Sequence, residues 1–410
     1  MSGKAGLEMM DVAIAGGGVI GHALAVALKR SGGPGFEVAL IAPPPARAAA
    51  RPAQRAIALG RGSVALFGAI GIWPAIAGRA QAMERIIVTD GRPGGSQLSL
   101  LEFADGAGAG AQAQVIDEDV LAAACATAAA NAGVRLIADR VAGFAAAEPG
   151  AAIDLASGGR IGARLAVGAD GARSLLRRAA GIRTVGWCYG QSALVARVGH
   201  ERDHHGVAVE RFLPAGPFAV LPLRGRASSL VWTEPEAGAR RLAGGGADNL
   251  RRELAARWDL ERGQIGRIGP VATFALSFHV ARRFASPRLA LAGEAAHQVH
   301  PLAGQGLNLG LRDVAALTEI VVGARRLGLD HGALPALERY ERWRRFDTIS
   351  SALAYDGLNR LFSNDNDGLR LARDLGLGVV DRLGFLKRAF MREGAGLAGT
   401  VPRLMTGKVV

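Results

Sequence analysis

Two apolar runs near the N-terminus are separated by a glycine-rich stretch and by an apolar segment with helical spacing. Residues 11–15 (DVAIA) and 37–42 (EVALIA) are typical of short buried strands. Between them, residues 16–21 predict a turn and residues 22–30 a helix. This order of strand, turn, helix and strand predicts a βαβ unit, in which the two strands lie parallel.

The rest of the chain alternates between helical and strand-like spacing. A period of two over residues 192–198 and 207–233, as in RFLPAGPFAVLPL, predicts an antiparallel sheet. A helical period covers residues 307–327 and, from residue 334, continues to about residue 391. The other predicted helices cover residues 62–70, 117–131 and 248–258, and the other predicted strands cover residues 85–89, 134–138, 153–155, 165–168 and 289–292.

These elements predict an α/β (α+β) fold, with a Rossmann-like nucleotide-binding domain, an inserted antiparallel-sheet substrate domain and C-terminal helices. The nucleotide-binding domain is discontinuous, because strands that suit it recur on both sides of the antiparallel pattern. We assign residues 1–80, 106–182 and 276–335 to the nucleotide-binding domain, residues 81–105 and 183–275 to the substrate domain, and residues 336–410 to the C-terminal helical region.

Composition and charge exclude several classes of protein. Half of the 410 residues are apolar and 21% are charged, which indicates a well-buried globular chain. The net charge of +13 comes from arginines spread along the chain, without the basic and aromatic clusters of nucleic-acid binders, so we expect no nucleic-acid partner. Cys125 and Cys188 are too few for a disulfide framework and indicate a reducing compartment.

One apolar segment, residues 12–28, imitates a targeting sequence. Its four glycines favour the buried strand, turn and helix of a nucleotide-binding unit over a signal peptide, and it is short for a membrane span. We find no transmembrane helix elsewhere and expect a cytoplasmic location. Peripheral contact with the inner membrane is left open.

The first motif with chemical meaning is Gly16-x-Gly18-x-x-Gly21. Gly16 permits a tight turn, Gly18 lets the backbone approach a pyrophosphate, and Gly21 allows close packing of helix on strand. The helix N-terminus then faces the phosphate charge. An acidic residue usually ends the second strand and binds the ribose, but Ala42 stands there. A plain glycine-rich turn is the alternative interpretation.

Two further motifs lie downstream. Residues 168–174 (GADGARS) follow a predicted strand, and their simplest interpretation is a turn capped by Asp170. Residues 293–297 (GEAAH) and 300–313 (HPLAGQGLNLGLRD) are more specific. Gly304 and Gly306 let the chain pass close to a flat ring, and the amides of residues 306–308 at a helix start can donate to an electron-rich edge such as the pyrimidine of a flavin. A reduced flavin carries negative charge there, which the helix dipole would stabilise.

Together, these motifs resemble those of the FAD-dependent aromatic hydroxylases related to para-hydroxybenzoate hydroxylase. Residues 300–313 are similar to the signature of the ubiquinone-biosynthesis branch, and the chain looks most like the 2-polyprenyl-6-methoxyphenol hydroxylases. The resemblance covers essentially the whole chain. It extends to residues 55–59 (RAIAL), 189–191 (YGQ), 211–223 and 358–365 (LNRLFSND).

The resemblance implies a set of cofactor contacts. Gly16, Gly18 and Gly21 would hold the FAD pyrophosphate, and the turn at Asp170 and Gly171 would lie near both FAD and the pyridine nucleotide. Glu294 would contact the ribityl chain. The remaining contacts would be Pro301 beside the isoalloxazine, Gly304, Gln305, Gly306, Leu307 and Asn308 along its pyrimidine edge, and Arg55 close to the flavin.

The implied activity is hydroxylation of a polyprenylated phenol on the way to ubiquinone, with NAD(P)H as reductant and O2 as co-substrate, through a flavin hydroperoxide. Other ubiquinone-biosynthesis proteins and a second copy of the chain are candidate partners. The catalytic residues stay unknown at this stage. Two alternatives are a hydroxylase of a different small aromatic compound and a catalytically degenerate protein that binds lipid or partner hydroxylases, which Ala42 and Asp119 motivate.

Several other polar residues have plainer interpretations. His297 and His300 are three positions apart, but no further ligand completes a metal site, so we expect no metal and a role in loop packing or beside the flavin. His204 and His205 lie in a polar loop and are expected to be solvated. The basic and apolar residues from 382 to 392 predict an amphipathic helix that packs on the body, or else rests on anionic lipid.

Overall fold

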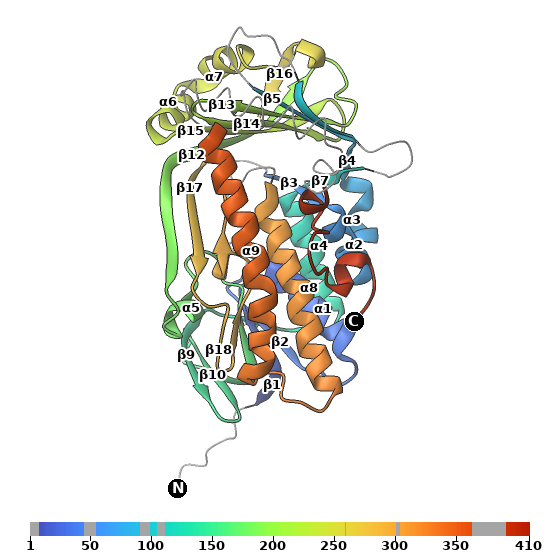
Figure 1. Ribbon diagram of the computed structural model, residues 1–410, viewed down its shortest axis with the longest axis vertical. Coiled ribbons are helices and arrows are strands. Elements are labelled where there is room, and N and C mark those ends of the chain that lie inside the picture. Colours follow the sequence, from blue (N-terminus) through green and yellow to red (C-terminus); the bar gives the residue numbers. More distant parts are fainter. Residues whose placement is uncertain are drawn as a thin grey trace.

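The computed structural model describes residues 8–44, 55–90, 99–104, 111–258, 260–300, 304–362 and 391–410. It combines an eight-stranded sheet, a nine-stranded sheet and a small three-stranded sheet with long helices. Figure 1 shows the nine-stranded sheet across the top of the molecule and the helical body below it. The predicted α/β fold with an added antiparallel sheet is confirmed.

The eight-stranded sheet has a parallel centre. Its order is β18-β19-β11-β1-β2-β8, and the hairpin of β9 and β10 extends β11. Strands β1, β2, β8, β11 and β19 pair in parallel. The central residues of β1, β2, β11 and β19 are buried, as expected for strands covered on both faces, whereas the edge strand β8 is largely exposed. The bounds are β1 Met9–Ala15, β2 Val38–Ala42, β8 Arg135–Ala138, β9 Val141–Ala147, β10 Gly150–Leu155, β11 Arg160–Gly168, β18 Ala285–Ser286 and β19 Leu289–Leu291.

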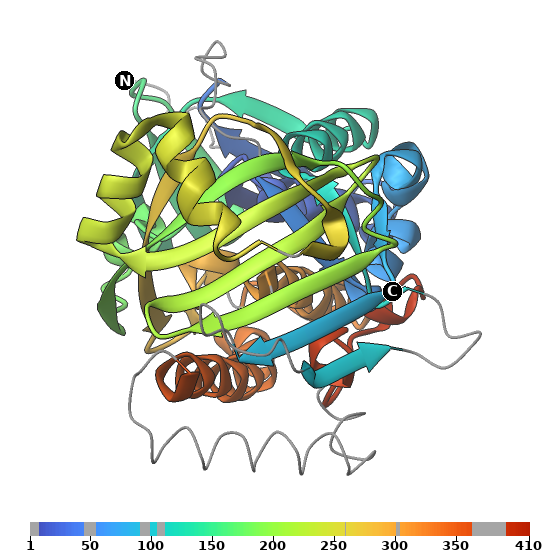
Figure 2. The same cartoon turned by 90° about the horizontal axis from the view of Figure 1, so that it is seen from above.

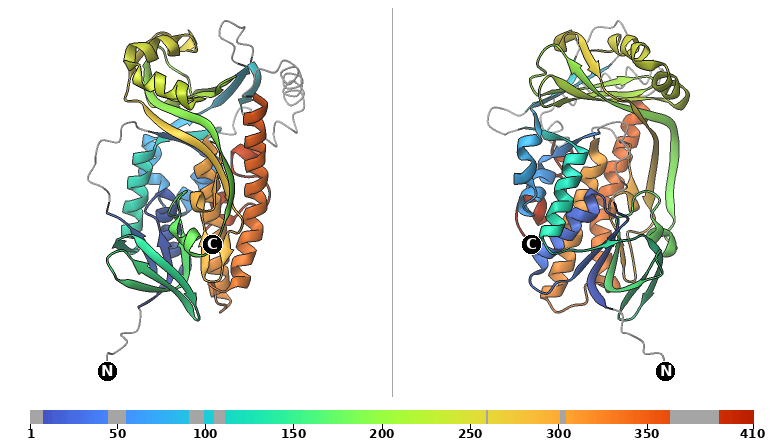
Figure 3. Two further views of the ribbon diagram at one scale, coloured as in Figure 1. Left: turned by 90° about the vertical axis from the view of Figure 1, so that its left-hand side faces the viewer. Right: turned by 180° about the vertical axis from the view of Figure 1, so that it is seen from behind.

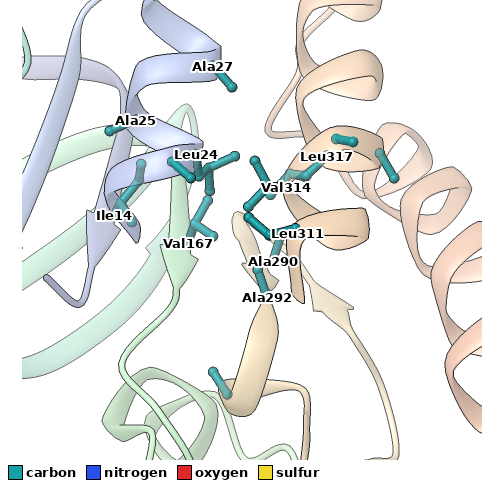
Figure 4. Close-up of a cluster of buried hydrophobic side chains, with 14 of the residues drawn as sticks. Ile14, Leu24, Ala25, Ala27, Val167, Ala290, Ala292, Leu311, Val314 and Leu317 are labelled. Carbon is teal, nitrogen blue, oxygen red and sulfur yellow. The ribbon is translucent and has the colours of Figure 1, made fainter. Parts of the chain in front are cut away.

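Helices α1 (Val19–Gly32) and α8 (Gln305–Arg326) enclose the main core against this sheet. Figure 4 shows Leu24 of α1 facing Leu311 and Val314 of α8, with Val167 of β11 beside Leu24. The two helices approach closely, because a Cβ added at Gly310 would lie only 2.8 Å from Ile20 Cδ1. This packing brings the start of α8 beside the start of α1.

The nine-stranded sheet is antiparallel except where β13 and β5 pair in parallel. Helices α6 (Glu236–Gly244) and α7 (Gly246–Ala255) cover its outer face, where Trp232 and Phe218 are buried (Figure 2). The order is β20-β17-β12-β15-β14-β13-β5-β6, with β16 beside β12. The bounds are β5 Arg85–Asp90, β6 Ser99–Ala104, β12 Thr184–His200, β13 Val207–Leu213, β14 Gly216–Leu223, β15 Ala227–Pro235, β16 Ile265–Ile268, β17 Ala272–Ala281 and β20 His297–Gln298.

Strands β12 and β17 run from the upper sheet down along the body, as both views of Figure 3 show. Strand β17 ends at Ala281 and β20 pairs with it, so two strands of this sheet reach beyond residue 275. The domain boundaries themselves stay a prediction.

A three-stranded sheet joins the inner face of the nine-stranded sheet to the body. Ala58 and Val115 of this small sheet pack with Ala208 and Leu221 of the large one. Its order is β3-β7-β4, with bounds β3 Ala56–Gly60, β4 Gln81–Met83 and β7 Ala113–Asp117. The neighbouring helices are α2 Arg61–Ala69, α3 Trp73–Ile76 and α4 Glu118–Asn131, and the short helix α5 is Leu175–Ala179.

Helix α9 (Leu334–Phe362) packs beside α8 (Figure 1). Residues 391–410 then return to the body, where the 3₁₀ turn Arg403–Thr406 buries Leu404 and Met405 and the Gly62 amide donates to Ala395 O at 3.0 Å. Most of the basic segment 382–392 lies outside the described residues, so its contact with lipid stays a prediction.

Among the described helices, none is by itself long and apolar enough to cross a membrane. The bent pair Arg61–Ala69 and Trp73–Arg79 meets that criterion by length and composition only.

Candidate functional site

The three sequence motifs meet at one edge of the eight-stranded sheet. Ala15 of β1 is in register with Gly168 of β11, and Gly168 is in register with Leu291 of β19. Gly16, Asp170 and Glu294 follow these three strands. In open α/β sheets, ligands bind at the carboxyl ends of the parallel strands. The fold therefore assembles one candidate ligand site from segments more than 100 residues apart.

The glycine loop has the geometry that the motif predicted. Gly16 has a φ of +119°, and a Cβ there would lie 2.1 Å from Ala169 O. A Cβ at Gly21 would lie 1.9 Å from Gly16 O, whereas a Cβ at Gly18 would meet no atom within 4 Å. Gly16 and Gly21 are thus required by the fold itself. Gly18 is exposed and faces open space, which leaves room for a phosphate.

Helix α1 begins at this loop without a protein cap. Gly18 is its N-cap residue, no side chain caps the helix, and its first turn contains no acidic residue. The first amides of a helix have no intrahelical partner, and the helix dipole makes this end positive. The start of α1 can therefore bind an anion such as a pyrophosphate.

The end of β2 carries no acidic side chain, as the sequence indicated. Ala42 ends that strand, and a Cβ at Gly17 would lie 2.6 Å from Ala42 Cβ. The small side chain of Ala42 thus lets the glycine loop approach the strand end. A ribose bound here receives no hydrogen bond from position 42.

Asp170 has a clear structural role. Its Oδ2 accepts hydrogen bonds from the amides of Leu175 at 2.7 Å and Leu176 at 3.3 Å, which caps α5. Its Oδ1 is buried and has no partner among the described residues. Gly171, with a φ of +79°, completes the turn. The capping interpretation is confirmed, and contact of this turn with FAD stays a prediction.

The start of α8 is a second uncapped helix N-terminus. Gly304 is its N-cap residue with a φ of +65°, no side chain caps it, and the first turn carries no acidic residue. A Cβ at Gly306 would meet no atom within 4 Å, so this turn also borders open space. The Gln305 side chain donates to Gly394 O at 3.4 Å, and Leu307 is half-buried. Pro301 lies outside the described residues.

Asn308 holds the start of α8 against the small sheet. Its Oδ1 accepts hydrogen bonds from the Gly60 amide at 3.0 Å and from Ser63 Oγ at 2.6 Å, and its Nδ2 donates to Ala58 O at 2.8 Å. The side chain is buried. The sequence placed Asn308 along the flavin edge, but its side chain faces β3 and α2, so only its backbone is free for that role.

We expect Asn308→Ala to lower the free energy of unfolding by roughly 2–3 kcal/mol, because it removes three buried hydrogen bonds and leaves two backbone groups without partners. Ser63→Ala removes only one of these bonds and should cost about 1 kcal/mol. Chemical denaturation of both variants checks this order. Equal losses of unfolding free energy in the two variants would contradict the larger contribution expected from the several hydrogen bonds of Asn308.

Arg55 and Glu294 both have contacts within the protein. Arg55 Nε is 3.6 Å from Glu118 Oε2, and its guanidinium lies over the Phe274 ring at 5.0 Å. Arg55 thus connects the body to the nine-stranded sheet. The Glu294 side chain is exposed, and its carbonyl accepts a hydrogen bond from His279 Nε2 at 3.0 Å. Contact of either side chain with the flavin stays a prediction.

A buried ionic cluster behind the third motif was missed by the sequence reasoning. Asp313 accepts hydrogen bonds from the Gly293 amide at 2.9 Å, His297 Nε2 at 2.6 Å and Arg344 Nε at 2.8 Å. Arg344 also donates to Asp347 Oδ2 at 2.6 Å. Burial alone would raise the pKa of Asp313, but the attraction and hydrogen bonds of His297 and Arg344 outweigh it and lower that pKa below 3.8. The cluster fixes the turn at Gly293 to α8 and α9.

His300 is buried beside the start of α8. Its ring meets the Tyr189 ring edge-on at 5.1 Å, and neither ring nitrogen has a hydrogen-bond partner among the described residues. Burial lowers the pKa of His300 to about 4, so the ring is neutral at physiological pH. Tyr189 donates to Asp356 Oδ1 at 2.9 Å. The described part of the chain contains no group of three metal-ligating side chains.

The prediction that His204 is solvated is wrong. His204 is buried, and its Nε2 donates to Leu223 O at 2.6 Å, because the loop folds back onto β14. His205 is exposed, as expected.

The residues of this edge fit a dinucleotide with a flat ring: two uncapped helix starts, two glycines that border open space, and an unpaired Asp170 oxygen. The model of the FAD binding domain family matches residues 9–326. Ubiquinone hydroxylase UbiL of Rhodospirillum rubrum is 42% identical over 409 residues, which cover 98% of this chain and 93% of that protein. The chain belongs to the FAD-dependent hydroxylases. The resemblance of the motifs to this family is thereby confirmed.

A second hydroxylase relative and the solved structures agree. The 3-demethoxyubiquinol 3-hydroxylase of Escherichia coli is 35% identical over 94% of this chain and 98% of that protein. Among solved structures, p-nitrophenol 4-monooxygenase PnpA of Pseudomonas putida has a TM-score of 0.76 at 18% identity, covering 96% of this chain and 99% of that one. Klebsiella pneumoniae HpxO, solved with FAD and uric acid, has a TM-score of 0.72 at 17% identity and covers 94% and 97%. The fold of this FAD-dependent monooxygenase is that of the aromatic hydroxylases.

Proposed function

We propose that this FAD-dependent monooxygenase hydroxylates the aromatic ring of a polyprenylated phenol in ubiquinone biosynthesis, with NAD(P)H as reductant and O2 as co-substrate. The observation that carries the proposal is the 42% identity to a ubiquinone hydroxylase across 98% of the chain. A relative named for demethoxyubiquinol hydroxylation, matched over 94% of the chain, supports the same substrate class.

The edge of the sheet where the three motifs meet would supply the positions for this chemistry. When bound, FAD carries the redox step between the reductant and O2, and the protein contributes binding, orientation and exclusion of water. The start of α1 would hold the pyrophosphate at Gly18. The amides of residues 306–308, in the first turn of α8, would donate to the pyrimidine edge and stabilise its negative charge after reduction.

The inner face of the nine-stranded sheet would bind the phenol. This face meets the small sheet, and the small sheet is bonded to the start of α8 through Asn308. A substrate on it would therefore lie between the sheet and the pyrimidine edge. The face is lined mostly by Ala, Val, Leu and Phe, which suits an aromatic ring with a prenyl tail.

An assay with two matched phenols tests the proposal. Purified protein with FAD and NADPH receives a methoxyphenol with a short prenyl tail or the same phenol with a methyl group in place of the tail. We expect the tail to raise kcat/KM at least tenfold, because each buried methylene contributes about 0.8 kcal/mol. Oxygen consumption and product mass measure turnover.

The alternatives give different results in the same assay. A hydroxylase of a small aromatic compound would prefer the phenol without the tail. Among the structural neighbours, PnpA is named for p-nitrophenol and HpxO was solved with uric acid. A degenerate member that only binds lipid or partners would be colourless after purification and would not take up added FAD. Reductant consumption without hydroxylated product from either phenol would contradict the proposed substrate class.

A further inference from the structure

Glu210 interrupts an otherwise apolar row across the nine-stranded sheet. It is in register with Val88 on β5 and with Ala219 on β14. Directly paired residues project from the same face of a sheet. The row continues on that face through Leu101, Val231, Val195 and Ala272. Glu210 is thus a single carboxyl group among aliphatic side chains.

The row of Glu210 lies on the inner face of the sheet. Successive residues of a strand alternate between faces, so Arg211, paired with Phe218, projects to the outer face beneath α6 and α7. Ala208, two residues before Glu210, belongs to the same buried cluster as Ala58 and Val115 of the small sheet. The Glu210 side chain is therefore directed toward the FAD-binding body.

The contacts of Ala58 relate this face of the sheet to the predicted cofactor site. Its carbonyl accepts the hydrogen bond from Asn308, and a Cβ at Gly304 would lie 3.8 Å from Ala58 Cβ. Ala58 thus contacts the start of α8 and shares a buried cluster with Ala208. Two residues along a strand span about 7 Å. Glu210 therefore lies about 7 Å along the strand from Ala208, a residue of the cluster that joins this sheet to the small sheet.

No described residue forms a hydrogen bond or ion pair with Glu210, although only 9% of its surface is exposed. The charged groups of the facing elements have other partners: Arg55 lies 3.6 Å from Glu118, and Arg197 lies 3.6 Å from Asp117. Burial raises the pKa of Glu210 to about 7. A buried carboxyl group without a partner destabilises a fold, so its place on a substrate face indicates a ligand that pairs with it.

We propose that Glu210 contacts the phenolic substrate and accepts the proton of its ring hydroxyl group. This proposal rests on the proposed function, because a phenol supplies that proton. The O–H bond breaks, the proton passes to the Glu210 carboxylate, and the electron pair stays on the phenolate oxygen. That pair conjugates into the ring and raises the electron density of the ring carbon that accepts oxygen in the proposed reaction.

His300 is the rival proton acceptor, because its buried ring nitrogens also have no partner among the described residues. Its pKa of about 4 makes it a weak base at neutral pH, whereas the pKa of Glu210 lies near 7. General bases are most effective when their pKa is close to the working pH. Glu210 is therefore the better match.

The test compares Glu210→Gln with wild type as FAD-loaded enzymes, with NADPH and a geranylated methoxyphenol as probe. We expect hydroxylated product per bound flavin to fall at least a hundredfold in Glu210→Gln, within the range of general-base effects. NADPH oxidation should continue, so product per NADPH also falls. Glu210→Asp should restore part of the rate. Glu102→Gln is the matched control, because Glu102 is paired with Ile87 and projects from the outer face of the same sheet.

Two measurements distinguish proton acceptance from a structural role. Removing an unpaired buried charge should raise the Tm of Glu210→Gln above that of wild type at pH 8, where wild-type Glu210 is ionised. Binding of the probe to oxidised wild type should show phenolate absorbance at pH 7.5, and binding to Glu210→Gln should show neutral phenol.

Equal product per NADPH in wild type and Glu210→Gln would overturn the assignment, as would neutral phenol on wild type. A loss of product confined to His300→Gln would transfer the role to His300. If wild type converts no prenylated phenol, the proposed function fails, and the absorbance of the bound probe still decides the role of Glu210. If Glu210→Gln does not fold, the wild-type absorbance and Glu210→Asp provide the decision.

Discussion

Gly18→Val should produce a folded protein that binds FAD roughly a hundredfold more weakly. A Cβ at Gly18 meets no protein atom within 4 Å, and the backbone there is extended, with φ of −81° and ψ of −179°, so valine fits the fold. Its methyl groups would occupy the space for the pyrophosphate. Loss of one or two charge-assisted hydrogen bonds, each about 1.5–3 kcal/mol, gives this magnitude. Titration of apo-protein with FAD, followed by flavin fluorescence, measures it.

Gly16→Ala is the matched variant from the same loop. Its Cβ would lie 2.1 Å from Ala169 O at a φ of +119°, so the backbone must move and the fold itself is strained. We expect a lower Tm for the apo-protein of Gly16→Ala and an almost unchanged Tm for Gly18→Val. Unweakened FAD binding by a folded Gly18→Val would show that the pyrophosphate does not lie at this loop.

Asp313→Asn should lower the free energy of unfolding by about 3–5 kcal/mol, because it removes one of the two carboxylates paired with the buried Arg344, the one that is itself fully buried. The cluster also holds the Gly293 amide and His297, so the variant should bind FAD more weakly as well. Asp154→Asn breaks an exposed ion pair with Arg160 and should cost at most about 1 kcal/mol. Urea denaturation of both variants measures these losses. Similar losses of unfolding free energy would show that the buried cluster contributes no more stability than an exposed ion pair.

The effect of Asp313 depends on pH in a defined direction. Its pKa in the folded protein is lowered below the ordinary value of 3.8, so its contribution to stability is present above that value. The contribution disappears as the pH falls through the lower folded pKa. The difference in stability between wild type and Asp313→Asn should therefore be largest above about pH 4 and should shrink in stronger acid.

The meeting of the three motifs at one edge of the sheet could be predicted because their signals are local. Gly16, Asp170 and Glu294 each follow a short apolar run, and parallel strands end at the same edge of a sheet. The glycine spacing also predicts a close backbone approach, which the positions of Cβ atoms at Gly16 and Gly21 confirm. Local pattern and parallel pairing were sufficient for this part of the molecule.

The hydrogen bonds and ion pairs that hold the candidate site in place could not be predicted, because they join segments that are distant in sequence. Asn308 bonds to Gly60, 248 residues away, and Asp313 bonds to Arg344 across two helices. In sequence these are ordinary polar residues on helices. His204 was wrongly predicted to be exposed to solvent. Its loop is polar in sequence, but the loop folds back so that the ring is buried and donates to the Leu223 carbonyl.

Glu210 carried a signal that strand alternation could have detected. It has the same parity as Ala208 and Phe212, which are apolar and face the body, whereas Arg211 has the opposite parity. A carboxyl group at an inward-facing position of a predicted strand breaks the pattern and indicates either a buried partner or a ligand. The sequence alone does not say which face of the sheet is turned toward the body. The order of the strands and the cluster that contains Ala58 are needed to decide this.

The central claim is that the protein inserts oxygen into the ring of a prenylated phenol at an FAD site between the starts of α1 and α8. Turnover under isotopically labelled O2, with NADPH, FAD and a geranylated methoxyphenol, tests it most directly. We predict that mass spectrometry will find one labelled oxygen atom in the product from wild type and a strong loss of that product from Gly18→Val at limiting FAD. Consumption of NADPH and O2 with no label in the phenol would contradict the account.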